Sequence, residues 1–273
     1  MDDIDEDTKV ELHTGRTMPI IGLGTWDLTT STAAIVSQAL HLGYPLIDTS
    51  GDYGTQQGIG EGIKKSGVTR DSLYLVTKVE EADDGYEATK KNLAELQLSY
   101  ADLVLIHRPP EEGVGEDIWR GLIRARRDGL VKDIGVSNYS VTQIQTLANM
   151  TGELPVVNQI EWSPFGWSPS MLEFAEANDI IIQAYSPLTR GKRFSDSVLQ
   201  GIANKHGVTE AQILIRWCLE MGVVPLPKAN HLEHLRDNID VFDFELEAID
   251  IEKLDALNEQ YSALSKRLIY EEQ

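Results

Sequence analysis

The sequence contains little cysteine and little positive charge. Cys218 is the one cysteine among 273 residues, so the chain cannot form an internal disulfide, and its place in an apolar helical segment predicts a buried thiol. Lys and Arg total 24 against 44 Asp and Glu, a formal net charge of −20 at pH 7. This charge repels phosphate backbones and anionic headgroups, so neither nucleic acid nor a membrane surface is an expected partner.

Long hydrophobic runs are also missing. No apolar stretch reaches the roughly eighteen residues that a membrane span needs, and the acidic start of the chain does not match a signal or transit peptide. The sequence therefore predicts a cytoplasmic protein, a monomer, with residues 1–8 as a flexible acidic tail. No linker composition divides the chain, and 41% hydrophobic residues suffice for a large core, so one domain over 1–273 is expected.

Short apolar segments with strand character alternate with longer amphipathic segments. Two strand candidates, Lys9–Leu12 and Thr17–Ile20, flank a glycine-containing turn and predict a β-hairpin. Eight further strand candidates follow: Ile20–Thr25, Leu46–Asp48, Leu73–Lys78, Asp102–His107, Lys132–Val136, Val156–Glu161, Ile180–Ala184 and Val223–Pro227.

Apolar residues at three- and four-residue spacing between these strands predict helices. The clearest are Thr30–Leu42, Tyr86–Leu98, Glu116–Arg127, Thr142–Met150 and Pro169–Asn178, with Glu245–Leu257 as a helix outside the repeat. Glycines 43, 129 and 222 suit the left-handed position after a helix end. Eight βα units over about 250 residues predict a (β/α)8 TIM barrel preceded by the hairpin, with a doubly wound open sheet as the alternative.

Three consecutive predicted strands end at reactive side chains. Asp48, Lys78 and His107 close the second, third and fourth strands, and Tyr53 follows Asp48 by five residues. In a barrel these groups meet at one mouth and suit hydride addition to a carbonyl, because Tyr53 can protonate the oxygen and His107 can donate a second hydrogen bond. We expect Lys78, held by Asp48, to favour the ionised phenol and make Tyr53 a better acid.

The order of several short motifs identifies a resemblance to a known family. Ile47-Asp48-Thr49 with Tyr53, Thr77-Lys78, the segment 102–107, Gly135-Val136-Ser137-Asn138, the segments 158–161 and 184–188, and Pro227-Lys228 resemble the aldo-keto reductases over nearly the whole chain. The resemblance implies a (β/α)8 barrel that reduces aldehydes or ketones with NADPH. It also implies a catalytic tetrad of Asp48, Tyr53, Lys78 and His107, and no metal site.

The same resemblance assigns a cofactor site. It implies that Ser137, Asn138 and Gln159 bind the carboxamide, that Tyr185 stacks on the nicotinamide ring, and that Ser186 and Leu188 line the pyrophosphate. The basic cluster of Arg190, Lys192 and Arg193 either assists there or forms a solvated loop. Lys228 and His234 are placed at the 2′-phosphate, and Asp237 and Asn238 at the adenine.

Two departures from the family pattern concern the phosphate. Ala229 stands where Ser or Thr is usual, and His234 stands where Arg is usual. Arginine carries a permanent charge and a bidentate fork, whereas histidine is mostly neutral at pH 7. We therefore expect NADPH use with relaxed preference and substantial use of NADH.

The substrate side also departs from the pattern. Arg108 and Glu80 occupy positions that are usually aromatic, so we expect a pocket for polar substrates, with Trp26 as an aromatic wall. The competing function is a nicotinamide-binding, redox-sensing regulatory subunit without significant turnover. A barrel enzyme acting on phosphorylated metabolites is a third reading, but it leaves Tyr185 and the Ser137–Asn138 pair without a role.

Overall fold

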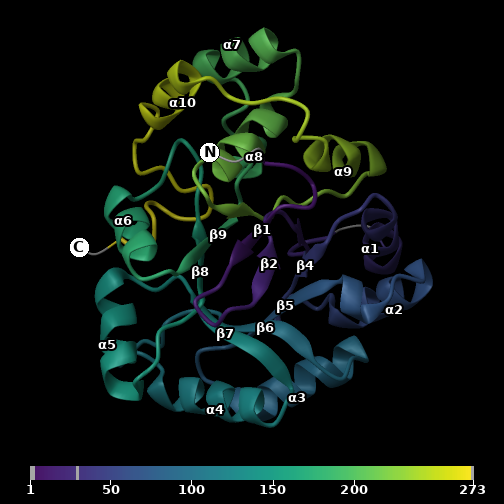
Figure 1. Cartoon of the computed structure of the whole chain (residues 1–273), viewed down its shortest axis with the longest axis vertical. Helices are drawn as coiled ribbons and strands as arrows, with labels where there is room; N and C mark the ends of the chain where they lie inside the picture. The colour runs from purple at the N-terminus through teal and green to yellow at the C-terminus, as the bar shows by residue number, and fades with distance from the viewer. Residues whose placement is uncertain (1–3, 29–30, 272–273) are drawn as a thin grey trace.

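The computed structural model describes residues 4–28 and 31–271. Within them, eight parallel strands form one sheet in sequential order, and helices surround it (Figure 1). The strands are β3 (Leu23–Gly24), β4 (Leu46–Asp48), β5 (Tyr74–Val79), β6 (Ala101–Ile106), β7 (Val131–Ser137), β8 (Val157–Glu161), β9 (Ile181–Tyr185) and β10 (Val224–Pro225).

The first and last strands meet and close the sheet. The backbone N–H of Gly22 donates to the carbonyl oxygen of Pro225 at 3.1 Å, and Gly24 donates to Pro227 at 3.0 Å. A Cβ on Gly24 would lie 2.7 Å from the carbonyl oxygen of Leu226, so this approach requires glycine. The predicted (β/α)8 barrel is confirmed, and the open doubly wound sheet is excluded.

The helices form the outer ring of the barrel. They are α1 (Thr32–His41), α2 (Gln56–Ser66), α3 (Gly85–Leu96), α4 (Glu116–Arg127), α5 (Val141–Thr151), α6 (Pro169–Ala177), α7 (Ser197–His206), α8 (Glu210–Glu220), α9 (Leu232–Ile239) and α10 (Ala248–Asp255). Helix α4, for example, buries the apolar stripe of Ile118, Trp119 and Leu122, whereas α10 packs on α7. Cys218 of α8 is fully buried, as predicted, and burial raises the pKa of its thiol.

The expected helices are confirmed, with small corrections at their ends. The sequence pattern placed the first helix from Thr30, which lies outside the described residues, and Ser31 caps α1 instead. The last helix begins at Ala248 rather than at Glu245. The pattern missed α7, a second helix between β9 and β10, whose start is marked by the Asp196 cap. Glycines 43, 129 and 222 have positive φ, as expected.

The predicted hairpin is confirmed as β1 (Lys9–Glu11) paired antiparallel with β2 (Thr17–Pro19). It lies across the centre of the ring of strands in Figure 1. Its buried side chains Leu12 and Met18 pack on Leu46, Leu103 and other residues inside the barrel. The hairpin therefore covers the N-terminal end of the strands, and the C-terminal end is left for ligands.

The acidic N-terminal segment precedes the hairpin. Residues 5–8 form a turn in which Thr8 Oγ1 donates to Asp5 Oδ1 at 2.7 Å, and the expected flexibility of residues 1–8 stays a prediction. Residues 1–3 of that tail lie outside the described part of the chain. No helix of the described residues is long and apolar enough to cross a membrane.

Candidate active site

The four predicted catalytic side chains converge at the C-terminal end of the barrel. Asp48 ends β4, Lys78 is the penultimate residue of β5, His107 follows β6, and Tyr53 comes from the loop between β4 and α2. Lys78 Nζ lies 2.8 Å from Asp48 Oδ1 and 3.3 Å from the phenol oxygen of Tyr53. The rings of Tyr53 and His107 meet edge to face with centroids 5.7 Å apart. Parallel strands in register thus bring together residues that are 59 positions apart at most.

Lys78 is fully buried and organises the group. Its ammonium donates to both carboxylate oxygens of Asp48, to the carbonyl oxygen of Thr49 at 2.8 Å, and to Tyr53. Burial lowers the pKa of Lys78, and the contact with Asp48 opposes that change. Because Lys78 donates to the phenol oxygen, the phenol hydrogen of Tyr53 is left to bond an acceptor in the cavity.

The expected acidification of Tyr53 is wrong for this arrangement. Burial raises the pKa of Tyr53 well above its ordinary value, and the carboxylates of Asp48, Asp52 and Glu80 raise it further, against Arg108. The physical reason is that a buried phenolate would lose hydration and face three negative charges. Tyr53 therefore keeps its proton at neutral pH and can act as a donor in its neutral form.

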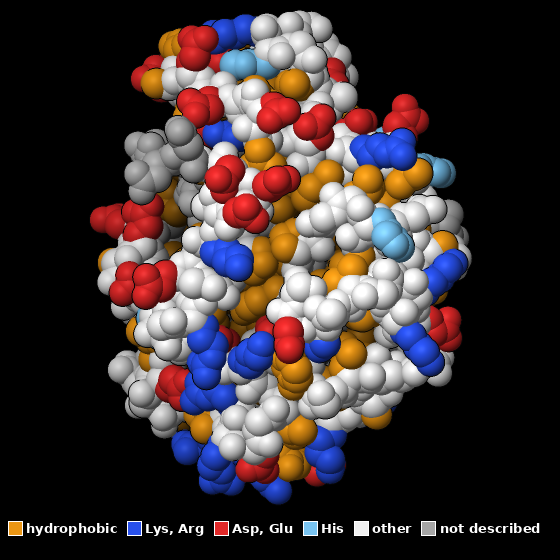
Figure 2. Space-filling model, turned by 45° about the vertical axis from the view of Figure 1, so that its right-hand side comes forward, with side chains coloured by type: hydrophobic (Ala, Val, Ile, Leu, Met, Phe, Trp, Pro, Cys, Tyr) orange, Lys and Arg blue, Asp and Glu red, His pale blue; other side chains and the backbone are white. Residues whose placement is uncertain are grey.

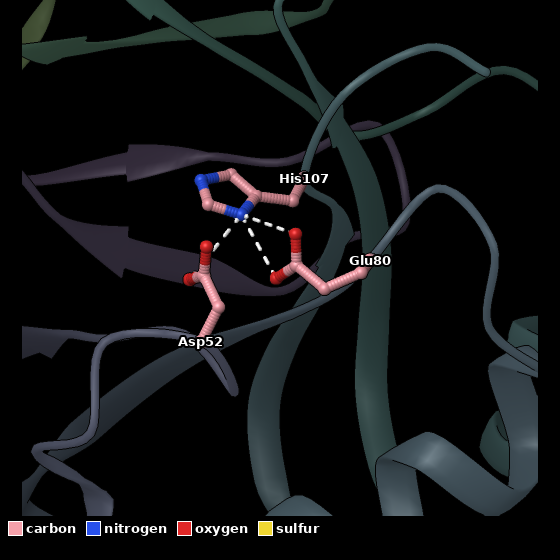
Figure 3. Close-up of side chains that lie close together, drawn as sticks. All are labelled: Asp52, Glu80 and His107. Atoms are coloured by element: carbon pink, nitrogen blue, oxygen red, sulfur yellow. Dashed lines mark hydrogen bonds and ion pairs between the residues drawn. The ribbon is translucent and has the colours of Figure 1, made fainter. Parts of the chain in front are cut away.

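His107 is enclosed by polar partners (Figure 3). Its Nδ1 lies 2.9 and 3.0 Å from the two carboxylate oxygens of Glu80 and 3.6 Å from Asp52 Oδ1. These three residues have the composition of a metal site, but Nδ1 lies within hydrogen-bond distance of Glu80, and we interpret the group as a hydrogen-bonded cluster. Arg108 lies within 4.0 Å of Asp52, Glu80 and Glu81.

The residues predicted for the carboxamide form a connected network. Tyr185 OH donates to Asn138 Oδ1 at 2.7 Å, and Asn138 Nδ2 donates to the carbonyl oxygen of His107 and to Ser137 Oγ. Gln159 Nε2 donates to Asp48 Oδ1 at 2.8 Å and to Gln183 Oε1 at 2.9 Å. Both donors of the Gln159 amide are used, which leaves its carbonyl oxygen to accept a hydrogen bond from a ligand.

Local sequence explains why these side chains face the cavity. Asn138 has φ of 65°, a left-handed conformation that asparagine tolerates better than most residues, so the backbone turns sharply after β7. Ser140 then caps α5 in a capping box with Gln143, and the helix begins at the next residue, Val141. The short loop fixes Ser137 and Asn138 beside the strand end.

Cationic side chains gather away from the tetrad. Lys228 Nζ donates to the backbone carbonyl of Asp27 at 2.9 Å, and the Arg190 guanidinium lies 5.0 Å from the ring centre of Trp26. His234 and His231 stack edge to face at 5.7 Å at the start of α9. The loop after β3 therefore meets the loops after β9 and β10 across the barrel mouth.

A cavity of about 740 Å³ joins the tetrad to these cations. Most of the predicted site residues line it: Trp26, Asp48, Tyr53, His107, Arg108, Ser137, Asn138, Gln159, Tyr185, Ser186, Leu188, Lys228 and His234. Lys78 lies behind Tyr53 and Asp48, and Glu80 contacts His107 rather than the cavity. Asp237 and Asn238 lie on α9 beyond the lining residues.

The residues present fit a nicotinamide dinucleotide. Neutral amides and one flat aromatic ring stand beside the tetrad, and Arg190, Lys228 and His234 stand toward the other end, as an uncharged carboxamide and anionic phosphates require.

Comparison with known proteins identifies relatives of this chain. The model of the Aldo/keto reductase family matches residues 20–259. The chain belongs to the aldo-keto reductase family. A glyoxal reductase of Bacillus subtilis is 40% identical over 255 residues, which cover 91% of this chain and 92% of that protein. A methylglyoxal reductase of Yersinia pestis is 36% identical over 255 residues, covering 90% and 92%.

Solved aldo-keto reductases have the same fold. The structure from Bombyx mori, in complex with NADP, superposes with a TM-score of 0.90 at 31% identity and covers 96% of each chain. An aldo/keto reductase from Brucella melitensis superposes with a TM-score of 0.87 at 37% identity, covering 92% of this chain and 99% of that one.

The sequence did not point to the C-terminal segment, residues 259–271, which lines this reductase cavity. Leu264, Ser265 and Ile269 reach the cavity, although the residues after Tyr261 carry no periodic pattern. The segment is held by Glu161 at the end of β8, which accepts hydrogen bonds from Ser262 Oγ at 2.5 Å and from the Ala263 N–H at 2.6 Å. Burial raises the pKa of Glu161, and these two hydrogen bonds oppose the change.

The three residues of the basic cluster, Arg190, Lys192 and Arg193, have different contacts. Arg190 lines the cavity, whereas Lys192 donates to the carbonyl oxygen of Ala263 at 2.7 Å and Arg193 pairs with Glu259. Arg193 also lies over the rings of Phe165 and Tyr261. Two of the three cations therefore hold the C-terminal segment, and the expected pyrophosphate role stays a prediction for Arg190 alone.

Proposed function

We propose that this chain reduces aldehydes or ketones to alcohols, with hydride supplied by NADPH or NADH and with Tyr53 as the proton donor. The observation that carries the proposal is the hydrogen-bond geometry of Tyr53. Its oxygen accepts from Lys78 at 3.3 Å, and its raised pKa keeps the hydrogen in place for transfer into the cavity.

The other tetrad members support that transfer. Lys78 fixes the phenol oxygen and brings a positive charge near it as the proton leaves, while Asp48 holds Lys78 from both carboxylate oxygens. His107 lies at the cavity wall beside Tyr53 and can donate a hydrogen bond to the same substrate oxygen. Proton donation of this kind contributes a rate factor of about 10²–10⁴.

Residues of the cavity would hold the cofactor at its two ends. We assign the carboxamide to Ser137, Asn138 and Gln159, with the ring of Tyr185 as the stacking surface. Ser186, Leu188 and Arg190 would face the pyrophosphate, Lys228 and His234 the 2′-phosphate, and Asp237 and Asn238 the adenine. A reduced nicotinamide supplies the hydride when it is bound there.

Small polar carbonyl compounds are the proposed substrates. Three exposed large hydrophobic side chains, Trp26, Leu264 and Ile269, line the cavity and give it apolar walls. Arg108 adds a charge at the rim, but carboxylates surround it, so we expect neutral dicarbonyls to be preferred over carboxylated ones. The names of the two bacterial relatives point to the same class.

We expect a locally built anion site, because the chain as a whole is acidic. Figure 2 shows Asp and Glu side chains mainly in the upper part of this face, Lys and Arg side chains mainly along the lower part, and hydrophobic side chains between them. Against a net charge of −20, phosphate binding has to come from a few placed cations such as Arg190 and Lys228.

Initial-rate measurements with NADPH and with NADH test the proposal. The panel should contain methylglyoxal, glyoxal, a simple aldehyde, a ketone and a 2-oxo acid, with Tyr53→Phe as the matched negative variant. We expect turnover of the dicarbonyls with both cofactors. Cofactor binding without turnover of any compound would reject the enzyme and favour the regulatory, redox-sensing function.

A further inference from the structure

Glu80 is aimed at His107 and stands outside the cavity that His107 lines. Figure 3 shows its carboxylate facing Nδ1 of the imidazole, with Asp52 on the other side of that nitrogen. Both Glu80 oxygens lie within 3.0 Å of Nδ1, and Oε1 also accepts from Ser50 Oγ at 3.1 Å. No other nitrogen of the ring is engaged by these groups, so Nε2 is the atom available to a substrate.

The protons of this contact can be assigned from the partners. Partial burial raises the pKa of Glu80, but the hydrogen bond and charge of His107, the Ser50 hydroxyl and Arg108 together lower it below its usual value. Glu80 is therefore ionised at neutral pH, and an ionised carboxylate accepts hydrogen bonds only. Nδ1 of His107 must carry the hydrogen.

A ring with hydrogen on Nδ1 has two possible states. The neutral form has a bare Nε2, which can accept a hydrogen bond but cannot donate one. Donation from Nε2 requires the form that carries both protons. The proposed function needs a donor at this place, because the substrate oxygen becomes negative as hydride arrives.

Building on the proposed function, we propose that Glu80 is a positioning residue that keeps a hydrogen on Nδ1 of His107. His107 then donates from Nε2 to the carbonyl oxygen only as an imidazolium. A charge-assisted hydrogen bond to an oxygen that is becoming an alkoxide is roughly twice as strong as a neutral one. The proton stays with His107, and the proton that completes the alcohol comes from Tyr53.

The surrounding charges are compatible with a cation at this place. Carboxylates outnumber cations among the groups that face His107 or its immediate partners: Asp48, Asp52, Glu80 and Glu81 against Lys78 and Arg108. The β4–α2 loop contributes Asp52 and the neutral Tyr53, and the loop after β5 contributes Glu80 and Glu81. Arg108, next to the histidine, is itself paired with these carboxylates.

The tautomer can be read directly in the protein without cofactor. Long-range ¹H–¹⁵N NMR of the His107 ring should show hydrogen on Nδ1 in the wild type. In Glu80→Gln the amide N–H₂ can donate to Nδ1, so a neutral ring with hydrogen on Nε2 should appear. A wild-type ring with a bare Nδ1, or an unchanged ring in Glu80→Gln, would overturn the proposal.

The pH dependence of kcat, at saturating cofactor, gives the catalytic readout. The wild-type rate of carbonyl reduction should fall about tenfold per pH unit once the pH is high enough to neutralise the His107 imidazolium. Glu80→Gln should start lower at pH 6 and lose this fall, because its neutral ring can donate from Nε2. Glu81→Gln, which removes the adjacent carboxylate, should keep the wild-type slope.

Two further outcomes separate this proposal from its alternatives. Activity lost to EDTA and restored by zinc would assign Nδ1 to a metal ion and overturn the role of Glu80, whereas insensitivity to EDTA supports it. Hydrogen on Nδ1 without reduction of any carbonyl compound would reject the proposed function while leaving the positioning of His107 by Glu80 in place.

Discussion

The ammonium of Lys78 donates a hydrogen bond to the phenol oxygen of Tyr53 over 3.3 Å while Asp48 holds it from behind at 2.8 Å. The direction of this bond decides what Tyr53 can do. Because the phenol oxygen already accepts from Lys78, its hydrogen is available to a substrate oxygen in the cavity. The buried Lys78 ammonium therefore orients the phenol hydrogen of Tyr53 toward the cavity.

Tyr53→Phe should abolish turnover and leave cofactor binding nearly intact. The substitution removes the proton donor but keeps the ring that packs edge to face on His107, so the fold and the cavity walls are preserved. We expect kcat/KM to fall by about 10²–10⁴ or more. Steady-state rates and cofactor fluorescence titration measure the two effects. A variant that retains most of its activity would show that Tyr53 is not the donor.

Lys78→Met should destabilise the barrel as well as inactivate it. Lys78 is fully buried against Asp48, and removing one partner of a buried pair leaves a charge without its counterion, at a cost of about 3–5 kcal/mol. Urea unfolding should show the loss, and the double variant Asp48→Asn with Lys78→Met should be less destabilised than Lys78→Met alone.

The exposed pair of Lys90 and Glu87 is the matched control for the buried one. Its two atoms lie 2.9 Å apart on the solvent side of α3, where such pairs contribute little. Lys90→Met should leave the unfolding midpoint unchanged. Equal losses in Lys78→Met and Lys90→Met would mean that burial of the Asp48–Lys78 pair does not determine its importance.

Local pattern predicted most of the barrel. The strand Leu46–Asp48 and the helix Glu116–Arg127 have the expected ends, because apolar runs and amphipathic spacing are properties of neighbouring residues. The segment after Tyr261 could not be placed, since it is held by contacts such as Ser262 with Glu161, 101 positions earlier, and such contacts leave no periodic signal.

In the candidate site too, some features could be predicted from the sequence and others could not. Strand ends indicated that Asp48, Lys78 and His107 would meet, because parallel strands in a barrel share one end. The contact of Glu80 with His107 and the raised pKa of Tyr53 could not be predicted, because they depend on side-chain direction and on the sum of nearby charges. Glu80 was assigned to the substrate pocket from its position in the sequence, and in the structure it contacts His107.

His234→Arg should tighten NADPH binding more than NADH binding. The histidine lines the cavity near Lys228, whose ammonium is partly engaged by Asp27, so a second permanent charge should add to phosphate binding. A charge-assisted contact contributes about 1.5–3 kcal/mol, which corresponds to roughly tenfold or more in Kd. Fluorescence titration with both cofactors measures it. Equal tightening of the two would place His234 away from the 2′-phosphate.

Gly166→Ala should displace the C-terminal segment from the cavity. A Cβ on Gly166 would lie 1.9 Å from the carbonyl oxygen of Tyr261, so the backbone of the segment has to move, with an overpacking cost of about 1–3 kcal/mol. Since Leu264 and Ile269 form part of the cavity wall, KM for the carbonyl compound should rise several-fold while the Kd of the cofactor changes little. Limited proteolysis should cut residues 259–271 faster than in the wild type.

Gly201→Ala in α7, where an added Cβ meets nothing within 4 Å, is the matched control and should retain the wild-type KM. An unchanged KM in Gly166→Ala would show that this segment does not shape the substrate pocket.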